Sequence, residues 1–469
     1  MLLAWLIAGV ASADDPSSDA PLREEEPAPL ARLPWENYVV PALENAAINF
    51  TMLSFNNLVT RMSYARVSPE SVARNLQPSS WTVDTDYFIT NQFGHAYHGN
   101  FNFNAARSSG LSFWVSGLYA LLNSLSWELF FEVEAPSVND QITTPIGGSL
   151  LGEALHRSAL QLRRSGGPKW LTSIGAALLD PLGALNGALL PEPPGEDETL
   201  DPLFVRWQFG AGGSVVIDRV DGERRAINPP QAIIAVLLIS GAPWISRSHY
   251  DEPLSYFDMR ADLSFPVNVT GNLFIRGLLF GKRVNGHGVW GLFGAYDYAS
   301  AAIVRASGVG LGPGVIFQWE PFSGWYVQTA GLVGASPFAA AGQLLDVPRE
   351  LGRDYHVGPG LQSNLDVRVL RPGVLQLELS MRTWVVVGVY TLPKGFESIT
   401  WLTAAATVPI WRWFGAGAEF TLADRRASFE GSRDNYDTGF SLRLLLSVMT
   451  EPNFGVRTQN EPSAPGGSP

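Results

Sequence analysis

The sequence predicts an α+β protein in which a transmembrane antiparallel β-barrel of about twelve strands follows an N-terminal helical domain. Two observations predict this fold. Several segments in the second half alternate apolar and polar residues over about eight to twelve positions, as in 259–265 and 375–382. The first half instead has long apolar stretches with helical spacing, and an acidic, proline-rich linker at 191–203 separates the two halves.

The composition narrows the possible classes of function. The chain of 469 residues has a formal net charge of −12, which argues against a nucleic-acid partner because such a partner requires a basic surface. Cysteine is absent, which excludes disulfides, thiolate catalysis and cysteine-based metal sites. The hydrophobic fraction of 46% is ample for a large core.

The N-terminus has the character of an export signal. Residues 1–13 are apolar and end in Ala11-Ser12-Ala13, the small-x-small pattern of a signal-peptidase site. We therefore expect a signal peptide at 1–13, a disordered spacer at 14–34 and export to the bacterial outer membrane. The expected partners are outer-membrane lipid and the barrel-assembly machinery.

Residues 35–190 are expected to form the helical domain, within which short groups of polar residues stand out. Asn91, His95 and His98 fall at i, i+4 and i+7, on one stripe of a helix. Glu128 and Glu132 share a face of the apolar stretch 110–133. The simplest partner for these acids is the histidine stripe, because charged residues are rarely buried without a partner.

A third polar group starts near Asp140. Thr144 is a suitable N-cap and Pro145 suits a first helical position, so we expect a helix to begin there. Glu153 and His156 follow at i, i+3, a spacing that resembles half of a carboxylate-bridged di-metal site. A second Glu-x-x-His copy is absent from the sequence, so we predict neither a metal site nor another cofactor.

Together these segments predict a polar seam between helices, and its function has two interpretations. One is a hydrogen-bonded structural network, or a site for an unknown small molecule or lipid. The other is acid–base catalysis, with His95, His98, Glu128, Glu132 and Asp140 as candidates. The sequence lacks the common nucleophile motifs, which opposes an enzyme. The residues expected in the seam are Asn91, His95, His98, Arg107, Glu128, Glu132, Asn139, Asp140 and Glu153.

The polar motifs also resemble those of a known family. The motifs that carry the resemblance are Trp81-x-x-Asp84-x-Asp86, Asn91-x-x-Gly94-His95-x-x-x-Gly99, Ser126-Trp127-Glu128, Ser137-x-Asn139-Asp140 and Gly152-Glu153. The stretch from about Trp35 to Leu190 is similar to a bacterial domain-of-unknown-function family of predicted outer-membrane proteins. The resemblance implies an envelope location and a barrel-associated helical domain. It implies no activity, so no role is transferred to any residue.

Residues 204–449 are expected to supply the strands, and 450–469 a disordered tail. A twelve-strand lumen is too wide for its own side chains to fill. We therefore expect the helical domain to plug the lumen or the periplasmic mouth of the barrel, with packing against the barrel wall as the alternative. The residues predicted to face the lumen are Arg206, Arg260, Asp262, Asp366, Arg368, Glu378 and Arg382.

These observations predict an outer-membrane β-barrel protein with a role in envelope binding, transport or scaffolding. The alternative is an envelope hydrolase or transferase that modifies lipid or glycan through His95, His98 and Glu128. The lack of a nucleophile motif makes the enzyme the less favoured of the two.

Overall fold

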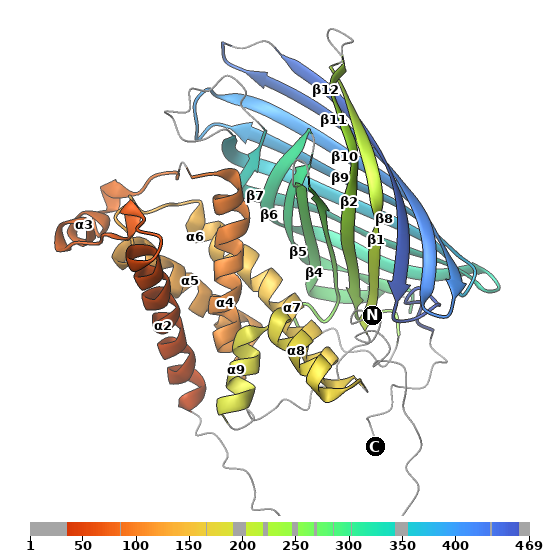
Figure 1. Cartoon of the computed structure of the whole chain (residues 1–469), viewed down its shortest axis with the longest axis horizontal. Coiled ribbons are helices and arrows are strands. Elements are labelled where there is room, and N and C mark those ends of the chain that lie inside the picture. The colour runs from red at the N-terminus through yellow and green to blue at the C-terminus, as the bar shows by residue number, and fades with distance from the viewer. Residues whose placement is uncertain are drawn as a thin grey trace, which may run out of the picture.

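The computed structural model describes residues 35–84, 86–165, 167–190, 203–218, 224–245, 252–266, 270–284, 286–301, 303–342, 355–431 and 434–458. Its strands close into one antiparallel barrel of twelve strands in sequence order, in which β1 pairs with β12 (Figure 1). The predicted fold class and strand number are confirmed. The expected signal peptide and spacer, and residues 191–202 of the expected linker, lie outside the described residues.

The strands are long, as expected for a barrel that crosses a membrane. They are β1 (Leu203–Asp218), β2 (Arg224–Ser240), β3 (Phe257–Phe265), β4 (Thr270–Val284), β5 (Gly288–Ala301), β6 (Val304–Phe322), β7 (Trp325–Ala341), β8 (His356–Arg371), β9 (Leu375–Gly388), β10 (Gly395–Trp411), β11 (Phe414–Phe429) and β12 (Asn435–Met449).

The helical domain precedes the barrel. Its α-helices are α2 (Glu36–Leu58), α3 (Pro69–Asn75), α4 (His95–Arg107), α5 (Phe113–Phe130), α6 (Asp140–Ile142), α7 (Gly148–Arg164), α8 (Lys169–Leu179) and α9 (Pro181–Leu189). Two 3-10 turns, η1 (Ser63–Ala65) and η2 (Pro78–Ser80), flank α3. Two π-helical turns, η3 (Thr90–Gly94) and η4 (Thr143–Gly147), lead directly into α4 and α7. Among the helices described, none combines the length and the apolar character needed to cross a membrane.

The π-helical turns correct two predictions. The chain is already helical at Asp140 and continues through η4 into α7, so Thr144 lies inside a helix and is not its N-cap. The turn η3 changes the helical register before His95. Asn91 therefore leaves the predicted stripe, and its amide donates instead to the hydroxyl oxygen of Tyr355 on the barrel at 2.8 Å.

The helical domain lies against the outer wall of the barrel, beside strands β3 to β7 (Figure 1). Leu150 of α7 packs beside Gly294 of β5, and the Phe88 ring stacks on Tyr298 with centroids 5.5 Å apart. On β4, outward-facing Ile275 belongs to this interface, whereas the next residue, Arg276, faces the lumen. The expected plug in the lumen or at the periplasmic mouth is therefore wrong, and packing against the wall is the observed arrangement.

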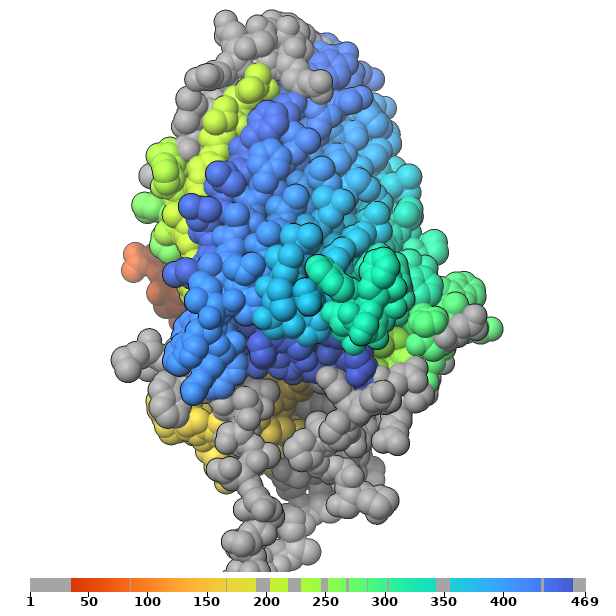
Figure 2. Space-filling model, turned by 90° about the vertical axis from the view of Figure 1, so that its right-hand side faces the viewer, coloured from red at the N-terminus to blue at the C-terminus, as the bar shows by residue number. Residues whose placement is uncertain are grey.

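Within the described part of the chain, no helix covers the opposite wall. Figure 2 views the molecule from this side and shows the outer faces of β8 to β12 turned to the viewer. Large apolar side chains are exposed there, including Leu365, Leu379, Phe420 and Leu444. The outer surface of the barrel therefore has the apolar character expected of a wall that faces lipid.

Charged side chains fill the lumen, which explains why the helices do not enter it. All seven residues predicted to face inward take part in this network. Arg260 on β3 contacts Asp366 on β8 at 2.9 Å and Glu378 on β9 at 2.6 Å. The expectation of a lumen too wide to fill is wrong, because arginine side chains reach across it.

Residues 451–457, which follow β12, close one end of the lumen. Phe454 is fully buried in a cluster with Phe204, Leu370 and Met449. The guanidinium of Arg368 donates to the carbonyl oxygen of Phe454 at 2.9 Å. The expected disordered tail is therefore wrong for these residues, whose apolar side chains find partners inside the barrel mouth. Residues 459–469 lie outside the described part of the chain.

A glycine substitution tests the close packing within the helical domain. A Cβ added at Gly99 would lie 1.9 Å from the carbonyl oxygen of Thr144, a backbone atom that cannot move aside. We expect Gly99→Ala to lower the free energy of unfolding of the helical domain by about 3 kcal/mol or more, measured by urea titration in detergent.

Gly94→Ala is the matched control, because the nearest atom to its added Cβ is 3.7 Å away. We expect this change to alter stability by less than about 1 kcal/mol. Equal losses in the two variants would contradict the packing argument.

Candidate functional site

The candidate site forms where α4 and the η4–α7 segment approach each other most closely. Gly99 and Gly148 meet there without side chains, and a Cβ on Gly148 would lie 2.4 Å from the Gly99 backbone. This approach places Thr144 beside His95, with Thr144 Oγ1 and His95 Nδ1 3.3 Å apart. Both residues follow or belong to a π-helical turn, a feature that is frequent at functional sites.

His95, Glu128 and Asp140 converge at this point from three elements. Each residue has one atom that could bind a metal, a histidine nitrogen or a carboxylate oxygen, and these three atoms lie within 4.8 Å of one another. His95 Nε2 and Asp140 Oδ2 are 3.6 Å apart, too far for a direct hydrogen bond. Glu128 and Asp140 are buried, whereas the side chain of His95 is 17% exposed. The group therefore has one side open to solvent.

Neighbouring groups hold the carboxylates in place. The Ser137 amide donates to Glu128 Oε2 at 2.7 Å, and the Asn139 side chain donates to Asp140 Oδ1 at 2.9 Å. Glu132 is only partly buried and accepts a hydrogen bond from the Trp127 indole at 3.0 Å. Such partners fix the orientation of carboxylates that act on a ligand.

The electrostatics of this group are unfavourable for so many negative charges. Burial raises the pKa of Glu128, and the nearby carboxylates of Glu132 and Asp140 raise it further. Burial also raises the pKa values of Glu132 and Asp140, while His95 acts in the opposite direction. The arrangement can therefore hold protons at neutral pH or bind a cation between its oxygens.

His98 lies beside this group without joining it. Its ring packs edge-on against Trp127 with centroids 5.6 Å apart, and burial lowers its pKa to about 3. His98 is therefore neutral under physiological conditions. The predicted pairing of both histidines with the acids is observed for His95 alone.

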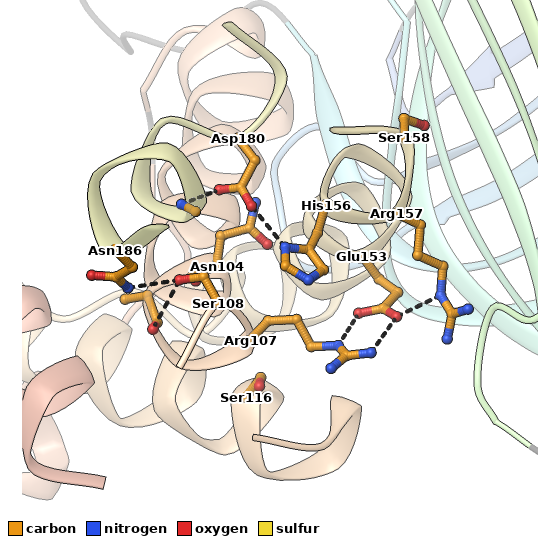
Figure 3. A network of polar contacts seen from close by, with 12 residues as sticks. Asn104, Arg107, Ser108, Ser116, Glu153, His156, Arg157, Ser158, Asp180 and Asn186 are labelled. Atoms are coloured by element: carbon orange, nitrogen blue, oxygen red, sulfur yellow. Dashed lines mark hydrogen bonds and ion pairs between the residues drawn. The ribbon is translucent and has the colours of Figure 1, made fainter. Parts of the chain in front are cut away.

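Glu153 belongs to a second polar centre, shown in Figure 3. It accepts hydrogen bonds from Arg107 and Arg157 at 2.8 and 2.7 Å. His156, three residues further on, turns away and pairs with Asp180 at 2.7 Å. The Glu-x-x-His spacing therefore does not bring these two side chains onto a shared ligand.

Sequence analysis missed several residues of this second centre. Asp180 accepts from the Gly183 amide at 2.8 Å as the N-cap of α9, and also pairs with His156. The Asp-Pro pair that starts α9 was the available signal for the cap, although not for the partner. Arg157 gave no signal in sequence spacing. Neither did Asn49 on α2 and Asn123 on α5, which lie outside this centre and whose amides exchange hydrogen bonds.

The arginine pair of Glu153 predicts a dependence of stability on pH. Burial alone would raise the pKa of Glu153, but Arg107 and Arg157 outweigh it and hold the pKa at about 2. The unfolded-state pKa is higher, so Glu153 stabilises the folded state above about pH 4.3, and this contribution disappears as the pH falls towards 2. We expect Glu153→Gln to lower the free energy of unfolding at pH 7 by about 3–5 kcal/mol.

The measurement is urea unfolding at pH 7 and at pH 3 in detergent. The difference between Glu153→Gln and wild type should shrink at the lower pH. Glu430→Gln, at an exposed side chain, should show little effect at either pH. A Glu153 effect that is independent of pH would contradict the assignment.

One known protein family is similar to part of the chain. A family model described as Domain of unknown function (DUF3943) matches residues 80–182, which include His95, Glu128 and Asp140. This match supports an uncharacterised family over that segment. No curated protein matches the chain.

Several solved outer-membrane barrels match in structure. The NanC porin shares 10% identity with a TM-score of 0.27, and the match covers 51% of this chain and 98% of that chain. An outer membrane channel from Pseudomonas putida F1 shares 10% with a TM-score of 0.28, covering 55% and 99%. The Pseudomonas putida toluene transporter TodX shares 8% with a TM-score of 0.22, covering 53% and 89%. At these identities and TM-scores, none of the three structures indicates a function for this chain.

Proposed function

We propose that this protein is an outer-membrane scaffold, in which a closed barrel holds the helical domain in the lipid beside it. The contact between Arg260 and Glu378 carries the proposal. These residues lie on β3 and β9, which are directly opposite each other in the ring, with five strands between them on either side. An ion pair of 2.6 Å between opposite walls leaves no wide path between them.

Further contacts across the lumen support closure. Arg276 on β4 reaches Asp366 on β8 at 2.9 Å, and Arg206 on β1 reaches Glu378 at 3.2 Å. A cavity between these groups, lined by Arg206, Arg260 and Arg443 among others, has a volume of about 80 Å³. This space suits a few water molecules and is far smaller than typical ligand pockets of roughly 300–1,000 Å³. Scaffolding is therefore better supported than transport through the lumen.

The surface of the helical domain supports contact with lipid. α5 has one charged residue, Glu128, and this residue is buried. The same helix exposes Trp114, Leu118 and Leu122, and α8 exposes Trp170, Ile174 and Leu178. The interior contains apolar residues such as Phe103 and Leu150, but also many buried asparagines and serines and several ion pairs. An apolar exterior around buried polar groups, many of them hydrogen-bonded or ion-paired, is the arrangement that a lipid environment favours.

The apolar helical surface continues that of the barrel wall. The Trp114 ring on α5 stacks on Phe280 of β4 with centroids 5.3 Å apart, at the edge of the covered part of the wall. Both rings are about half exposed. We therefore infer that the outer wall and the helices form one continuous surface that contacts lipid acyl chains. As for other outer-membrane barrels, we propose that the barrel-assembly machinery inserts the chain.

Closure of the lumen predicts low ion conductance. We expect wild-type protein in planar lipid bilayers to show no steady open-channel current, because ion pairs cross the lumen. The double variant Arg260→Ser/Glu378→Ser removes the pair between opposite walls and shortens both side chains, so current steps should appear or increase. Arg426→Ser, at an exposed pair with Asp424, is the control and should stay silent. Steady porin-like current from wild type would exclude a closed scaffold.

Lipid contact is testable because the chain has no cysteine of its own. Single cysteines at Leu122 and Leu178 would carry a bimane fluorophore, and protein in liposomes would be titrated with brominated phosphatidylcholine. We expect both labels to be quenched as strongly as a label at Leu444 on the free barrel wall. A label at Gln77, on an exposed polar segment, should be quenched little. Quenching at 122 and 178 that resembles position 77 would exclude the lipid-embedded arrangement.

A further inference from the structure

We propose that His95, Glu128 and Asp140 bind a divalent transition-metal ion. Imidazole nitrogen and carboxylate oxygen are ligands shared by Mn²⁺, Fe²⁺ and Zn²⁺. Ligand bonds to Zn²⁺ of about 2.0–2.2 Å place two ligands of one ion roughly 3–4 Å apart. The observed separation of His95 Nε2 and Asp140 Oδ2 is 3.6 Å, and the whole donor set falls within 4.8 Å. One ion can therefore contact all three residues after small side-chain movements.

Each ligand presents an atom towards this common point. Thr144 Oγ1 lies 3.3 Å from His95 Nδ1, which leaves Nε2 facing Asp140. Asn139 occupies Asp140 Oδ1, which leaves Oδ2 facing His95. The Ser137 amide fixes Glu128 through Oε2. Outer hydrogen bonds that orient a histidine and its carboxylate partners are a common feature of metal sites.

The charge balance at this site differs from that at Glu153. Glu153 has Arg107 and Arg157 within 2.8 Å, so two cations compensate one carboxylate. The charged groups that act on Asp140 are His95, Asp84 and Asp86, and those that act on Glu128 are Glu132 and Asp140. Within the described residues around the site, a divalent ion would supply the positive charge that arginine supplies at Glu153.

The site has an entry for an ion. The partly exposed His95 forms its open side. The exposed Asp86 interacts electrostatically with His95 and with Glu134, which is also exposed. These exposed acids would attract a cation to the opening. The inference takes the helical domain to be the ligand-binding part of the proposed scaffold, but its test does not depend on conductance or on lipid contact.

The experiment is calorimetric titration of ZnCl₂ and MnCl₂ into full-length, chelator-treated protein folded in detergent, with MgCl₂ for comparison. We expect one site per chain that prefers Zn²⁺ or Mn²⁺ to Mg²⁺. Glu128→Gln and Asp140→Asn, which keep the side-chain shape, should each weaken binding by about 100-fold or more. His287→Gln, at an exposed histidine in a barrel turn, is the control and should bind as wild type does. Wild-type affinity in the two acid variants, or loss in His287→Gln, would overturn the proposal.

Wild-type protein alone supplies an independent measurement if a variant fails to fold. Pulsed electron paramagnetic resonance of the Mn²⁺ complex should show the nitrogen coupling of one coordinated imidazole. Saturating metal should also raise the melting temperature of the helical domain, because binding to the folded state stabilises it. Absence of metal binding to the folded wild type would overturn the metal site and leave the scaffold proposal unaffected. The carboxylates would then form a proton-sharing structural cluster.

Discussion

The ion pairs that cross the lumen, Arg260 with Glu378 among them, leave no place for the helical domain inside the barrel. Once long side chains join opposite walls, the lumen has no room for another domain. The helices must then cover apolar surface elsewhere, and the outward faces of β3 to β7 provide it through residues such as Ile275 and Tyr296. Burying charges is costly unless partners are close, and here the lumenal Arg206 and Arg276 find carboxylates on other strands.

The helical domain buries more polar groups than a soluble helical bundle usually does. Asparagines, serines and ion pairs lie in its interior beside apolar residues such as Phe103 and Leu150, while other leucines and tryptophans are exposed. Two kinds of polar centre result. At Glu153, arginines balance the charge and the outcome is stability. At Glu128 and Asp140, carboxylates outnumber cations in the described surroundings, and an arrangement of this kind is more readily explained by a ligand than by stability.

The sequence was informative where a short pattern determines the structure. Period-two alternation located the strands, and the lumenal positions such as Arg260 and Asp366 followed from it. The nearness of His95 to Glu128 followed from the rule that buried charges need partners. The helical spacing that placed Asn91 and the capping preference that placed Thr144 were both wrong, because π-helical turns occur there and have no simple sequence signature. The prediction that the helices plug the barrel was wrong for a different reason. Whether the lumen has room for them depends on how far the arginine side chains reach across it, and that distance is defined only once the twelve strands have closed into a barrel.

The segment after β12 imposes an order on assembly. Phe454 occupies a pocket made by Phe204 from β1, Leu370 from β8 and Met449 from β12. Both the first and the last strand contribute side chains to this pocket, so the pocket is complete only after β1 has paired with β12. The segment then holds β1 and β12 together at this end of the barrel. Separation of the two strands must first remove Phe454 from its pocket, which slows their separation beyond what the backbone hydrogen bonds alone would do.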